Sequence, residues 1–238
     1  MKYIIFIFIM LVAYVLSITS MKYIKQKKIA DFIFAFLIFA LYVAHSFIIF
    51  KDVGFYDWNY QNTLPTANVS PFMFVLTPII LVFPKAIKPY FFLLISLLSF
   101  GMLSSAILGC AFNAFRNYAF HYHFAMDYTA HIIISLFGIY LVKTEQVKPT
   151  PKKCLISSLI IFAVAALMLI LNAIFDTAFF GLSLSGKHTI YNSVIVENSY
   201  LSALIYFTGL ATVLFLGYLY IKIIYKKSEV LYEKQQFT

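Results

Sequence analysis

The chain has 238 residues, of which 63% are hydrophobic and 11% are charged, and its formal net charge is +9. This composition, with a mean hydropathy of +0.90, excludes an ordinary soluble domain and predicts a membrane protein with several spans. The positive charge does not call for a nucleic acid, because basic residues collect in the cytoplasmic loops of membrane proteins. We therefore expect membrane lipids, and no nucleic acid, as partners.

Seven apolar segments follow one another along the chain, each close to the roughly 20 residues that a helix needs to cross a bilayer. The predicted spans are residues 3–19, 30–50, 66–84, 90–112, 124–142, 154–174 and 201–224. The third span contains Pro71, which a first helical turn tolerates, and Pro78, which should kink the helix. The prediction is an all-α, polytopic membrane protein in which residues 1–238 form one domain, a bundle of seven transmembrane helices.

Lysine and arginine are distributed unevenly among the connections between these spans. Fourteen follow spans one, three, five and seven, whereas four, Lys2, Lys51, Arg116 and Lys187, fall on the opposite side. By the positive-inside rule the N-terminus lies outside and the C-terminus lies in the cytoplasm of a multi-pass cell-membrane protein. We expect the first span to be retained, since cleavage after it would leave the basic stretch MKYIKQKK on the translocated side.

The fifth predicted span carries the strongest candidate site. Asp127 and His131 are four residues apart and therefore share one helix face, where the carboxylate can orient the imidazole. A histidine held in this way is suited to act as a general base, and ionisable groups at membrane depth are costly unless they face the bundle interior. The alternative is structural: Asp127 lies in the first turn of the helix and His131 bonds to a neighbouring helix.

Two other segments place polar groups at the outer ends of predicted spans. In TLPTANVSP, Asn68 and Ser70 precede span three; Ser70 before Pro71 is also an ordinary helix N-cap. In LNAIFDT, Asn172 and Asp176 share a face at the end of span six, although an intramembrane asparagine also serves to join helices. We expect these four groups to surround one cavity with the pair in span five.

The outer connections supply further candidates for substrate binding. The segment GLSLSGKHTIYN contains Lys187, His188 and Tyr191, and a lysine there suits a phosphate or a carboxylate; an ordinary solvated loop is the alternative. Trp58 lies in the connection between spans two and three. Binding without chemistry would be spread over such aromatic residues.

The sequence HYH before span five raises the question of a metal. His121, His123, Asp127 and His131 would together suffice for a zinc shell. Their spacing matches no strong zinc motif, so we predict no cofactor and keep zinc as the minor alternative.

The order of these motifs resembles the YwaF-type family of bacterial integral membrane proteins. The similar elements are LP in LPTANVSP, the histidine in YTAHIIISLFGIYL and the asparagine in LNAIFD, within residues 30–225. The resemblance implies distant relatives that transfer or hydrolyse lipid acyl groups with a nucleophile and a histidine, which corresponds to His131 here. The LP motif of that family also contains a histidine and a cysteine; here those positions are small or apolar, so Ser70, Thr177 or water would have to attack.

Two functions follow from these observations. The first is a lipid-modifying acyltransferase or hydrolase at the extracytoplasmic face, with His131 as general base, Asp127 orienting it, and Asn68 or Asn172 polarising a carbonyl group. The second is a transporter, an accessory subunit of a protein partner in the membrane, or a lipid- or peptide-binding protein, whose polar groups recognise a ligand without reacting.

Overall fold

The computed structural model describes residues 2–21, 24, 26–54, 64, 68–116, 121–175 and 199–236. All regular secondary structure in these ranges is helical. The helices in these ranges are α1 (Lys2–Ser20), α2 (Lys27–Val53), α4 (Val69–Ile80), α5 (Lys88–Phe115), α6 (Tyr122–Lys143), α7 (Pro151–Phe175) and α9 (Ser199–Gln236). Six of them are long and apolar enough to cross a membrane, and α4 is not. The chain is therefore an all-helical, multi-pass membrane protein.

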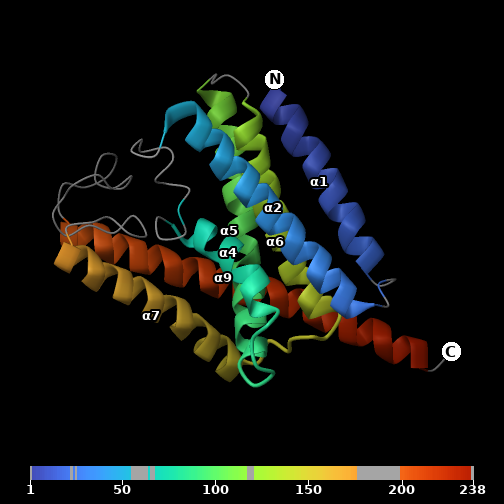
Figure 1. Ribbon diagram of the computed structural model, residues 1–238. Helices are drawn as coiled ribbons and strands as arrows, with labels where there is room; N and C mark the ends of the chain where they lie inside the picture. Colours follow the sequence, from blue (N-terminus) through green and yellow to red (C-terminus); the bar gives the residue numbers. More distant parts are fainter. Residues whose placement is uncertain are drawn as a thin grey trace.

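Helices α5 and α6 form the centre of the bundle (Figure 1). In α6, 72% of the most apolar stretch is buried inside the protein, whereas the value is 11% for α1 and for α2. Most of the surface of α1 and α2 is therefore available to lipid. The central pair packs closely because Gly138 has no side chain: a Cβ atom there would lie 2.9 Å from the carbonyl oxygen of Ile95. The hydroxyl of Ser96 lies 2.9 Å from the carbonyl oxygen of Gly138, a polar link typical of helices in lipid.

Three helices meet at a chain of buried hydroxyl groups. Tyr14 of α1 hydrogen-bonds Ser135 of α6 at 2.8 Å and Tyr220 of α9 at 3.2 Å. Tyr14 is 4% exposed, so its hydroxyl group depends on these two bonds, since neither water nor lipid tails can supply a hydrogen bond there. The cluster fixes how α1 and α9 lie against α6.

The short helix α4 departs from the prediction of a full third span over residues 66–84. Its 12 residues extend about 18 Å, well below the roughly 30 Å of a bilayer core. The backbone of Asn68 is extended before the helix, and the helix ends at Ile80, two residues after Pro78. After Ile80 the amides of Leu81, Val82 and Phe83 donate to carbonyl oxygens three residues back, so the α-helix gives way to tighter turns before Pro84.

Lysine side chains gather at one end of the bundle. Lys27 donates to the carbonyl oxygen of Thr144, and Lys143 donates to that of Ile18 at 2.8 Å, which ties the neighbouring ends of α1, α2 and α6 together. The histidines of α2 and α6 lie toward the opposite ends of these two helices. The candidate site is therefore far from the lysine-rich end, as the charge distribution predicts; which end faces the cytoplasm stays a prediction.

Candidate functional site

The His131 ring is held by its own helix. Its Nδ1 lies 2.9 Å from the backbone carbonyl oxygen of Asp127 and 3.5 Å from Oδ1 of the same residue. A carbonyl oxygen can only accept a hydrogen bond, so Nδ1 carries the proton and donates it. In the neutral ring Nε2 is then left with a lone pair, which is the state that a general base needs.

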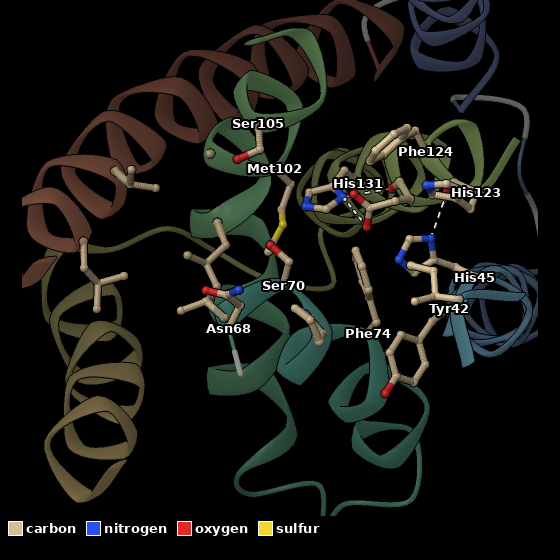
Figure 2. Close-up of a pocket in the computed structure, with 18 of the residues that line it drawn as sticks. Tyr42, His45, Asn68, Ser70, Phe74, Met102, Ser105, His123, Phe124 and His131 are labelled. Atoms are coloured by element: carbon tan, nitrogen blue, oxygen red, sulfur yellow. Dashed lines mark hydrogen bonds and ion pairs between the residues drawn. The ribbon is translucent and has the colours of Figure 1, made fainter. Parts of the chain in front are cut away.

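Aromatic packing fixes the same ring from a second direction. Phe74 of α4 meets His131 edge to face, with 5.0 Å between the ring centroids. The histidine is 7% exposed, and Figure 2 shows the edge that bears its second nitrogen directed toward Ser70 and Met102. Asp127 is the sixth residue of α6 rather than part of its first turn, so the structural alternative of a helix cap does not apply.

The free edge of His131 borders a cavity of about 980 Å³, at the upper end of the roughly 300–1,000 Å³ typical of small-molecule pockets. Helices α2, α4, α5, α6 and α9 all contribute to its wall. Of the groups predicted to surround one cavity, the structure brings four together: Asn68, Ser70, Asp127 and His131.

Helix α4 begins at this cavity. Asn68 is its N-cap and makes no capping hydrogen bond with its side chain, while Ser70 is the second helical residue. The prediction that Ser70 is the N-cap is thus wrong by two residues, because the chain leaves its extended conformation already after Asn68. Residues 68–71 all line the cavity, so it is bordered by the positive end of the α4 dipole and the amide of Asn68.

His45 of α2 belongs to the same cavity, whereas sequence reasoning did not select it. Its Nδ1 donates to the backbone carbonyl oxygen of His123 at 2.9 Å, so its Nε2 is also the nitrogen left without a proton in the neutral ring. The sequence does contain a signal for this role: His45, Ile49 and Asp52 are spaced by four and three residues and so share one face of a mostly apolar helix. All three line the cavity.

The four residues considered as a zinc shell, His121, His123, Asp127 and His131, do not converge on one point. Within the described ranges, no group of three or more His, Cys, Asp or Glu side chains is placed to hold a metal ion. His121 caps α6 and His131 is ten residues further along, about 15 Å on a helix, so the two cannot meet at one ion. His121 instead stacks on His123, with 5.3 Å between the ring centroids.

The remaining predicted site residues are not part of this cavity or cannot be placed. Asn172 is buried in α7, a helix that contributes nothing to the cavity wall, so the structure does not bring it to the cavity beside His131. The other predicted candidates lie outside the described residues: Trp58, Asp176, Thr177, Lys187, His188 and Tyr191.

Comparison with protein families gives one finding. A family model described as the TMEM164 family matches residues 1–221, almost the whole chain. No curated protein and no solved structure matches the chain. The match establishes a membrane-protein family, while the resemblance to the YwaF-type family and to lipid acyltransferases stays a prediction.

Proposed function

The chain belongs to the TMEM164 family, and from this premise we propose that it is a lipid-modifying enzyme that hydrolyses or transfers an ester-linked acyl group. The observation that carries the proposal is the state of His131: Nδ1 donates to a main-chain carbonyl, and the opposite edge of the ring faces a large cavity. A histidine that only joined two helices would direct its second nitrogen at a partner on another helix.

The cavity supplies the groups that an acyl transfer needs. Nε2 of His131 takes the proton of the attacking hydroxyl, which belongs to water or to Ser70, while the oxygen forms a bond to the ester carbon. The resulting oxyanion is stabilised by the amide of Asn68 and by the N-terminus of α4. The bond to the leaving alcohol then breaks, and the alkoxide recovers the proton from His131. When Ser70 is the nucleophile, the acyl group is left on its oxygen; water or an acceptor alcohol, deprotonated by Nε2, then attacks this acyl group and releases it, and the Ser70 oxygen takes the proton back.

The surroundings favour a lipid over a soluble ester. The cavity lies within a bundle of apolar helices, and its wall combines polar groups with apolar ones. The site lies toward the end of α2 and α6 opposite the lysine-rich end, so the positive-inside rule assigns it to the extracytoplasmic half of a bacterial cell membrane. Lipids of that leaflet are the proposed substrates.

The proposal is tested by ester release from the purified protein in vesicles that contain a phosphatidylglycerol with a fluorogenic acyl chain. His131→Ala should lower the rate by about 10²–10⁴-fold, the usual contribution of a general base. Ser70→Ala identifies the nucleophile: loss indicates a covalent acyl intermediate, and retention indicates water. Glu145→Gln, at the lysine-rich end, is the matched control and should leave the rate unchanged.

Full activity in folded His131→Ala protein would end the catalytic proposal. It would leave the non-catalytic alternative, in which the same cavity binds its ligand without reaction. Absence of turnover in the unaltered protein, together with saturable binding of the lipid, would lead to the same conclusion.

A further inference from the structure

Helices α5 and α9 pack against each other without a gap at two successive levels. Residues 97 and 101 share a face of α5, and residues 213 and 217 share a face of α9, because each pair is four residues apart. A Cβ atom at Gly217 would collide with the carbonyl oxygen of Leu97. One at Gly101 would lie 2.5 Å from Cγ1 of Val213. Glycine is required at 217, where the Leu97 backbone occupies the space of a side chain, and at 101 a side chain would have to displace Val213.

One turn further toward the cavity this packing ends. The next residues on the same two faces are Ser105 and Gly209, and a Cβ atom at Gly209 would meet nothing within 4 Å. Both residues are exposed and both line the cavity. Figure 1 shows the reason: α9 crosses α5 obliquely, so the two helices diverge beyond their contact. The cavity therefore continues between them to the surface of the bundle.

We call this continuation the α5–α9 crevice, and its wall is mostly apolar. The α5 and α9 residues in the cavity wall are Leu98, Gly101, Met102, Ser105, Ile205, Tyr206, Gly209, Leu210 and Val213. The histidines and carboxylates of the cavity all come from α2 and α6, and Asn68 and Ser70 come from the start of α4. The cavity thus has a polar side that contains His131 and an apolar side that opens outward.

We propose that the α5–α9 crevice holds the acyl chain of the lipid whose ester group lies at His131, and that Gly209 determines which chains fit. This inference rests on the proposed function and adds to it a binding site and a residue that governs specificity. A side chain at position 209 would project into the open space and shorten or close the crevice.

The position of the crevice in the bundle identifies the occupant as hydrocarbon. Leu108 of α5 and Leu204 of α9 are 67% and 62% exposed near its opening, so lipid tails surround this surface. Among the α5 and α9 residues that line the cavity, Ser105 and Tyr206 are the two with side-chain hydroxyl groups, which are too few to support an ordered chain of water molecules. A lipid can enter sideways and keep its chain in apolar surroundings while its ester reaches the polar side.

The first test measures binding without turnover. The protein is placed in vesicles that contain a phosphatidylcholine with a diazirine at the end of one acyl chain, irradiated, and mapped by mass spectrometry. Labelling of the Met102–Ser105 segment should fall about tenfold in Gly209→Leu protein, as a blocked pocket predicts. Ala211→Leu introduces the same side chain on an exposed face of α9 two residues on, and should preserve the labelling. Leu159, exposed on α7, reports general contact with lipid.

The second test measures which esters react. Gly209→Leu should lower the rate with hexadecanoyl esters about tenfold and change the rate with butanoyl esters less than about twofold. Equal losses for both esters, or unchanged labelling in Gly209→Leu, would overturn the inference. If the unaltered protein labels in the crevice and Gly209→Leu blocks that labelling, yet no ester reacts, the chain-binding site stands and the proposed enzyme activity fails.

Discussion

Glycine residues in α9 have two different roles, although the sequence presents them alike. Gly217 lies against the backbone of Leu97, where a methyl group has no room, and Gly209 faces open space. This difference between Gly209 and Gly217 arises because α9 crosses α5 obliquely, and the sequence alone does not reveal it. It also gives a direct test of that crossing.

Gly217→Ala should destabilise the protein by about 1–3 kcal/mol, because the added methyl group forces α9 away from α5. Gly209→Ala should leave stability unchanged or raise it slightly, since alanine favours a helix more than glycine does. The midpoint of thermal unfolding in detergent, followed by the loss of the monodisperse peak, measures both. Equal midpoints for the two variants would show that α5 and α9 do not touch at Leu97.

Helix positions were largely predictable, and helix contacts were not. Long apolar runs placed six helices within a few residues of their observed ends, apart from the C-terminal extension of α9 to Gln236, because crossing a bilayer demands such runs. The third predicted span was too long, since the helix changes to three-residue turns after Ile80, which hydrophobicity alone does not reveal. Asn172 looked equivalent to Asn68 in the sequence, yet α7 lies outside the cavity wall. His45 was not selected, because a single histidine in an apolar span more often packs between helices; its spacing to Asp52 on the same face was the signal that it lines the cavity.

The hydroxyl chain between α1, α6 and α9 should be energetically coupled. Tyr14→Phe removes the bond to Ser135, and Ser135→Ala removes its partner. We expect a coupling free energy of about 0.5–1.5 kcal/mol from the double-mutant cycle, the size found for hydrogen bonds between helices in lipid. Unfolding of the four proteins in mixed micelles with increasing denaturing detergent gives the value. Strict additivity of the two single effects would mean that the bond contributes nothing to holding α1 in place.

The whole molecule has a lysine-rich end and a histidine-rich end, and the orientation of the two in the membrane can be measured. A cysteine at Asp52, at the histidine-rich end of α2, should react with an impermeant maleimide added outside intact cells. A cysteine at Thr150, between α6 and α7, should react only after the membrane is opened. The native Cys110 and Cys154 are buried and give little background. Labelling of the Thr150 position from outside would reverse the assignment of the cavity to the extracytoplasmic half.

The carbonyl group that accepts from Nδ1 of His131 belongs to the main chain. No amino-acid substitution at Asp127 deletes this acceptor, because every residue in the helix has a main-chain carbonyl group. The proton on Nδ1 of His131 is therefore fixed by the helix backbone and not by the side chain at position 127. Replacing Asp127 by asparagine should therefore lower the ester rate by about tenfold, through lost support for the charged ring, without removing the base. Residue 127 can therefore vary in sequence while Nδ1 of His131 keeps its hydrogen-bond acceptor.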